Sequence, residues 1–143
     1  MSEQQNIELI KSGYAAFIGA DLQTLLDLFS EDLDFQHPMP QTIWPWAGKR
    51  KGRAGLAEFI AGINETIEYP QFEPREFIAS GDRVAVLVFE RCRVKATGVE
   101  FDNFYVHVFK FTGGKVSQFL IFEDTAPVIA ALQGYRKYLS PSG

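Results

Sequence analysis

The sequence predicts an α+β fold in which a cone-shaped, curved antiparallel sheet wraps around N-terminal helices. Apolar residues recur every three or four positions over Glu3–Gly19, which is the spacing of an amphipathic helix. After Gln71 the pattern changes to long stretches of alternating apolar residues joined by short turns. We therefore expect one domain over 1–143, with helices, a first strand and a loop in 1–67, the sheet in 71–124, and a last helix in 125–134.

The elements follow from local signals in chain order. Asp21 is a candidate N-cap for a second helix that reaches Phe29. A short strand over 33–36 ends before Pro38, and a loop rich in Pro, Gly and Trp runs to Gly52. A third helix is expected over 53–67, strands over 72–79, 83–95, 100–112 and 115–123, and a last helix over 127–132 before a polar tail.

Both faces of the strand over 83–95 are expected to be apolar. Three valines at positions 84, 86 and 88 alternate with Ala85, Leu87 and Phe89. The helices can cover only one of these faces. The simplest cover for the outer face is a second copy of the chain, so we expect a homodimer.

Composition narrows the class of protein. The chain has 46% hydrophobic residues and 13 Phe, which favours a core that surrounds a ligand, or a large interface. A net charge of −4 without a basic face argues against nucleic acid as a partner. The acidic N-terminus does not resemble a secretory signal, and no apolar run is long enough for a membrane span. With Cys92 as the single cysteine, these features predict a cytoplasmic protein that does not bind membranes.

The hairpin around Gly113-Gly114 carries the candidate site. Tyr105, His107 and Phe109 share one strand face, so an ionisable ring lies among aromatic rings. A two-residue turn places Asp124 on this face, whereas a three-residue turn places Glu123 there. In either register the acid lies opposite Asn103, about 13 Å from His107 at roughly 3.3 Å per residue, so the two cannot pair directly.

Several local strings resemble the SnoaL-like polyketide cyclases and ketosteroid isomerases of the nuclear transport factor two-like superfamily. The resemblance covers nearly the whole chain and is carried by the strings at 14–17, 19–22, 28–32, 46–48, 51–53, 81–86, 106–111, 114–116 and 124–125. It implies a helix-lined pocket inside a conical sheet, in a fold that hosts several functions.

The resemblance also implies roles for four residues. Tyr14 falls where ketosteroid isomerases keep an oxyanion donor. His37 and His107 replace the two aspartates of those enzymes, which changes the acid–base chemistry. Asp124 matches the acid–base aspartate of the cyclases. His107 and Asp124 are therefore the first candidates, although each of the four residues also has a structural explanation: Asp124, for example, can cap the last helix.

The expected ligand is a small apolar organic molecule. Trp44, Trp46, Phe59, Tyr105, Phe109 and Phe119 are the candidate ligand-binding rings. The sequence has no ligand spacing for a metal, no phosphate-binding glycine loop and no nucleophile motif, so no cofactor is expected. The favoured function is cofactor-independent proton transfer beside a carbonyl: isomerisation, cyclisation or dehydration. A non-catalytic binding module and a dimeric assembly domain with a filled pocket are the alternatives.

Overall fold

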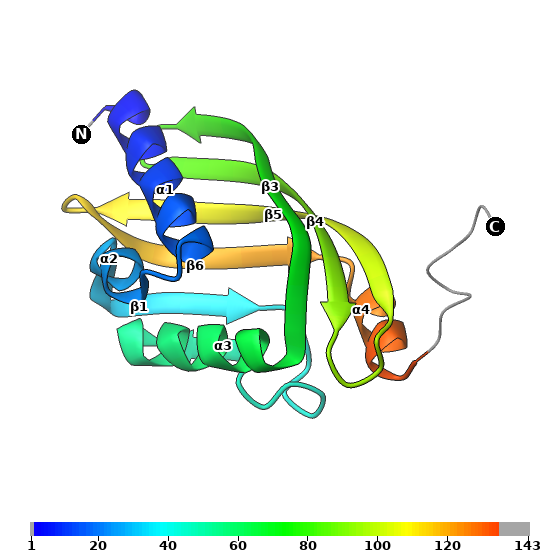
Figure 1. Cartoon of the computed structure of the whole chain (residues 1–143). Coiled ribbons are helices and arrows are strands. Elements are labelled where there is room, and N and C mark those ends of the chain that lie inside the picture. Colours follow the sequence, from blue (N-terminus) through cyan, green and yellow to red (C-terminus); the bar gives the residue numbers. More distant parts are fainter. Residues whose placement is uncertain (1, 135–143) are drawn as a thin grey trace.

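Six strands form one open, curved sheet in the order β2-β1-β6-β5-β4-β3, as a computed structural model of the chain shows for residues 2–134 (Figure 1). The predicted polar tail lies outside these residues. The α+β class is confirmed. The helices are α1 (Glu3–Ile18), α2 (Leu22–Asp27), α3 (Gly52–Thr66) and α4 (Thr125–Leu132), and the strands are β1 (Phe29–His37), β2 (Gly48–Lys51), β3 (Ile67–Ser80), β4 (Arg83–Val94), β5 (Glu100–Thr112) and β6 (Lys115–Glu123).

Side-chain caps fix the starts of three helices. Ser2 and Gln5 form a reciprocal capping box at α1. Asp21 accepts a hydrogen bond from the Thr24 amide at the start of α2. Asp124 accepts one from the Ala126 amide at the start of α4. The predicted helix starts therefore have a local cause that is visible in the sequence.

The sheet is mixed, whereas a purely antiparallel sheet was expected. β1 runs parallel to β6, and the other neighbouring strands are antiparallel. β2 is a four-residue edge strand inside the segment that was predicted as a loop. Its residues are one Gly and three Lys or Arg, so no apolar alternation marks it as a strand.

The other edge strand, β3, begins earlier than predicted. Pro70 and Pro74 lie at the two irregularities in its register with β4. Proline is tolerated there because an edge strand can leave a backbone position without a donor. The prediction that Pro70 ends the third helix and precedes the sheet was therefore wrong, since β3 already starts at Ile67.

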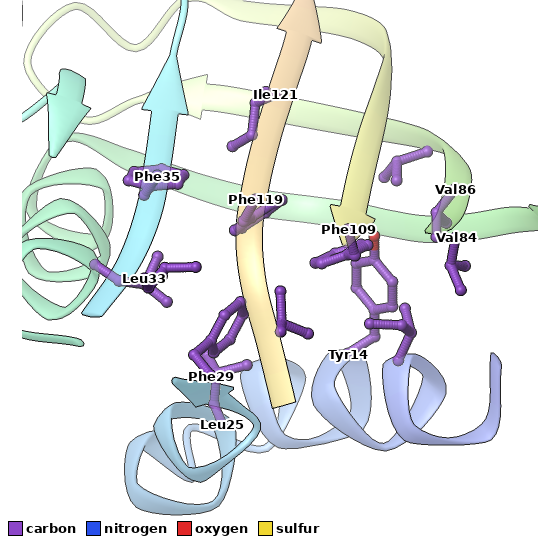
Figure 2. Packing of buried hydrophobic residues seen from close by; sticks show 14 of the residues in the cluster. Tyr14, Leu25, Phe29, Leu33, Phe35, Val84, Val86, Phe109, Phe119 and Ile121 are labelled. Atoms are coloured by element: carbon purple, nitrogen blue, oxygen red, sulfur yellow. The ribbon is translucent and has the colours of Figure 1, made fainter. Parts of the chain in front are cut away.

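The concave face of the sheet forms the core with α1, α2 and α3. Val84, Val86 and Val88 of β4 are almost fully buried on this face. Figure 2 shows Tyr14 rising from α1 toward Phe109 of β5. The helices cover one end of the concave face, and α4 lies at the opposite end of the strands (Figure 1).

The outer face of the sheet is apolar, and among residues 2–134 two of its large rings stay exposed. Leu87, Val106 and Phe122 lie in register across β4, β5 and β6. Phe104 and Phe122 are 65% and 56% exposed, which is unusual for large rings. No helix within residues 2–134 has the length and apolar character that a membrane span requires.

Two glycines with positive φ differ in the space around them, so substitutions at these positions distinguish the cost of backbone strain from the cost of a steric clash. Gly52, at the start of α3, has φ +73, and an added Cβ would lie 2.8 Å from the carbonyl oxygen of Glu31. Gly81 has φ +59 and open space around the Cβ position. We expect Gly81→Ala to lower the free energy of unfolding by about 1–2 kcal/mol, and Gly52→Ala to lower it by a further ~1–3 kcal/mol. Urea denaturation measures both; equal losses would contradict the steric explanation.

Candidate functional site

A cavity lies between the concave face of the sheet and helices α1 and α3. It contains about 880 Å³ of empty space, including its opening to solvent. Most of its walls are apolar, and among the described residues no Lys or Arg lines it. The aromatic residues in its walls are Tyr14, Phe17, Phe29, Trp44, Phe59, Tyr69, Phe72, Phe101, Tyr105, Phe109 and Phe119. The apolar and aromatic walls suit a small organic ligand.

Tyr14 and His107 form a buried pair in the cavity wall. The Tyr14 hydroxyl and His107 Nδ1 are 2.7 Å apart, so one hydrogen is shared between them. Burial lowers the pKa of His107 to about 3, and the nearby His37 contributes in the same direction. Burial also raises the pKa of Tyr14 well above its usual value. Both rings are therefore neutral at physiological pH. The pair can form hydrogen bonds with a ligand, but it carries no charge.

His37 and Glu123 meet at the end of the cavity where β1 stops. The backbone amide of Met39 donates to His37 Nδ1 at 3.1 Å, which leaves Nε2 to carry the hydrogen of the neutral ring. Nε2 lies 2.7 Å from Glu123 Oε1, and the two side chains are 3% and 6% exposed. Asn103 donates to the other oxygen, Oε2, at 2.6 Å.

The contact between His37 and Glu123 is close without being a well-aligned hydrogen bond. Glu123 Oε1 is buried and has no partner of hydrogen-bond geometry among the described residues. We interpret the 2.7 Å separation as an electrostatic contact that leaves a lone pair of Oε1 unused. This oxygen is a candidate proton acceptor in the cavity wall.

A bulge in β6 decides which acid faces the cavity. The turn has two residues, because Phe111 pairs with Val116 and Thr112 with Lys115. The register then shifts by one residue, so that Glu123 pairs with Tyr105. The two-residue register considered for the hairpin is therefore seen at the turn, but beyond the bulge neither register holds. The acid lies opposite Tyr105, two residues from the level of His107, and not opposite Asn103 as expected.

Asp124 is not part of the cavity. Its side chain is exposed and caps α4, whereas Glu123 beside it lines the cavity. Tyr14, His37 and His107 do line the cavity together, as do five of the six expected ligand-binding rings.

The sixth ring, Trp46, stands behind the cavity wall. It stacks on Trp44 with ring centroids 4.6 Å apart and is not among the lining residues. Its indole also lies directly on Gly62 of α3, where an added Cβ would be 2.2 Å from the ring. Trp46 therefore holds Trp44 in place by packing.

Glu90 is a site residue that the sequence analysis missed. It is 7% exposed and its Oε2 accepts a hydrogen bond from the Tyr105 hydroxyl at 2.8 Å. Burial, reinforced by the charge of Glu123, raises the pKa of Glu90 to about 7, although the Tyr105 bond opposes the shift. The signal was available: the period of two that buries Val84, Val86 and Val88 continues to Glu90.

The raised pKa of Glu90 predicts a pH-dependent stability. The folded pKa, about 7, exceeds the reference value of 4.5, so its protonated form stabilises the fold below the unfolded pKa and that stability is lost as pH rises through 7. We expect Glu90→Gln and the native protein to have similar free energies of unfolding near pH 4.5. At pH 8 the free energy of unfolding of the variant should be higher by on the order of 3 kcal/mol. Denaturant unfolding between pH 4.5 and 8.5 tests this; a difference that does not change with pH would contradict it.

Comparison with known proteins extends the description of the fold. The family model for the SnoaL-like domain matches residues 10–119, and the search of curated proteins finds no match. An NTF2-like protein of Burkholderia xenovorans is 34% identical, with a TM-score of 0.80 over 92% of this chain and 98% of that one. An NTF2-like protein of Burkholderia pseudomallei is 30% identical, with a TM-score of 0.82 over 92% and 98%.

A third solved structure contains a ligand. It is TerC, co-crystallised with polyporic acid, which is 27% identical with a TM-score of 0.78 over 90% of this chain and 98% of that one. The family model spans most of the described fold, including cavity-lining residues of α1, α3 and the sheet. The chain therefore belongs to the SnoaL-like family within the NTF2-like superfamily.

Proposed function

We propose that the protein binds a small, apolar cyclic or carbonyl compound in the cavity and catalyses proton transfer on it without a cofactor. The observation that carries this proposal is Glu123, a carboxylate held between His37 and Asn103 in a cavity whose walls are otherwise mainly apolar. Glu123 lines the cavity, and its Oε1 has no hydrogen-bond partner among the described residues, so this oxygen can receive a proton from a bound molecule. TerC, which has this fold, was co-crystallised with an organic molecule, which supports a ligand of this size class.

The proposed chemistry divides between the two carboxyl groups. Glu123 accepts a proton from the carbon beside the carbonyl, and His37 Nε2 remains close enough to stabilise the carboxylate that is later restored. Glu90, whose pKa is about 7, is half protonated near neutral pH and supplies a proton to the carbonyl oxygen or to a departing hydroxyl. The first outcome is enolisation and the second is dehydration.

The Tyr14–His107 pair has a separate role in this proposal. Both rings stay neutral, so the pair offers a hydrogen bond to the substrate oxygen without adding charge to the cavity. Asp124, which was with His107 one of the two first candidates for the proton-transfer residue, is replaced in this role by Glu123, because of the two neighbouring acids only Glu123 lines the cavity.

Solvent exchange tests proton transfer without knowledge of the natural substrate. Cyclic ketones incubated with the protein in D2O are expected to exchange the hydrogens beside the carbonyl faster than in buffer, as followed by NMR. Glu123→Gln should lower the protein-dependent rate ~100- to 10,000-fold. Asp124→Asn, which changes the neighbouring acid outside the cavity, should change it less than ~2-fold. Ketones that stabilise the protein in thermal shift without any exchange would favour the non-catalytic binding module.

We also propose that two copies of the chain associate through the outer sheet face. Phe104 and Phe122 are exposed on this face, and Phe122 continues a row formed by Val106 and Leu87. A second sheet packed on this row would remove these rings from water, and burial of apolar area is the main driving force of such interfaces.

A charge in this row should prevent association. Phe122→Lys is expected to convert a native dimer into a monomer, because the ammonium group would have to be buried without a partner. Light scattering coupled to size exclusion measures the mass. Ile18→Lys, at an exposed apolar position on α1, serves as the matched control and should leave the dimer intact. A native protein that is monomeric at high micromolar concentration would refute the proposal.

A further inference from the structure

A surface groove adjoins the cavity on the helical side of the molecule. It runs between the α1–α2 connection and α3 and contains about 1210 Å³ of empty space, including open solvent. Five residues line both spaces: Phe17, Leu25, Ile60, Tyr69 and Phe72. The two spaces therefore lie on either side of these five side chains, and a ligand tail that passes between them would reach from the cavity into the groove.

The outer walls of the groove are formed by apolar side chains, and those on α3 are small. On α3 they are formed by Ala57 and Ala61, whose small side chains leave room above the helix. On the opposite side Ile18 and Leu22 are 61% and 43% exposed. Exposed apolar side chains gathered around the opening of a cavity are typical of ligand-binding surfaces.

The groove offers no positive charge to an anion among its described lining residues. Among the described residues that line it, none is Lys or Arg, and its one acid, Asp21, already caps α2. The cavity adds Glu90 and Glu123, again without Lys or Arg among the described lining. A carboxylate or phosphate on the ligand would lie near these acids with no compensating charge.

We propose that the groove holds the distal part of the same molecule whose reactive head lies in the cavity, so that the substrates are elongated and carry an uncharged, apolar tail. The inference rests on the proposed function, because it uses the cavity as the site of the head. The occupant is a small molecule and not a second copy of the chain, since the groove shares five lining residues with the cavity and lies on the helices, away from the apolar outer face of the sheet.

A series of 2-alkylcyclohexanones with tails from methyl to octyl tests this proposal. Dissociation constants are measured by calorimetry. The native protein should bind ~4-fold more tightly for each methylene that enters the groove. A ketone whose tail ends in a carboxylate should bind more weakly than the methyl-ended ketone of the same length.

Substitution in the groove locates the tail. Ala61→Phe fills the groove from an exposed position of α3 and should abolish the dependence on tail length, while the methyl ketone binds as it does to the native protein. Ala54→Phe, at an exposed position of the same helix outside the groove, is the matched control and should keep the full dependence. Ala57→Leu is a smaller obstruction that should have an intermediate effect.

The outcomes separate this inference from the function on which it rests. If the methyl ketone binds and longer tails add nothing, or if Ala61→Phe leaves the length dependence unchanged, the groove does not hold the tail while the cavity remains a binding site. If no ketone of any length binds, the proposed function fails and this inference fails with it. A change of oligomeric state in Ala61→Phe would identify the groove as an interface between copies and would also overturn the proposal.

Discussion

The alternation of side chains on β4, β5 and β6 is the constraint on which the site depends. These strands are neighbours in the sheet, so their inward residues form one continuous surface. Glu90 is paired with Asn103, and Tyr105 with Glu123, so both carboxyl groups and their partners face the same concave side. A shift of one residue in any of these strands would turn its polar groups outward. The chemistry of the cavity is therefore a property of strand register.

The same surface separates polar from apolar regions. Phe109 and Phe119 stack 4.5 Å apart on the concave face, and Figure 2 shows Phe109 next to Tyr14 of α1. The carboxyl groups lie farther along the strands, where Asn103 and Tyr105 donate hydrogen bonds to them. Buried acids are tolerated in proteins when such donors are present. One end of the cavity can thus contact the hydrocarbon part of a ligand, while the carboxyl groups at the other end can accept or donate protons.

Much of this arrangement can be predicted from the sequence, because periodicity and caps are local. The helices, the long strands and three of the four candidate polar residues follow from them or from the family resemblance. Two features could not be predicted, and both depend on tertiary structure. β2 forms because its backbone pairs with β1, although its side chains are charged. The bulge in β6 adds one residue after a turn whose glycines fix only the turn itself. Glu90 was missed for another reason: it continues the period of two that buries Val84, Val86 and Val88, but a buried acid is an exception to the rule that charged side chains face water.

The packing of Trp46 on Gly62 has an evolutionary consequence. The indole occupies the volume that any other side chain at position 62 would need, so neither residue can vary freely while the other is unchanged. Relatives in which this helix carries alanine or a larger residue should have a smaller ring, or none, at the position of Trp46. In those relatives Trp44 would lose its support from behind, and the shape of the cavity would change without any substitution among the residues that face it. Divergence of ligand preference within the family can therefore begin outside the cavity wall.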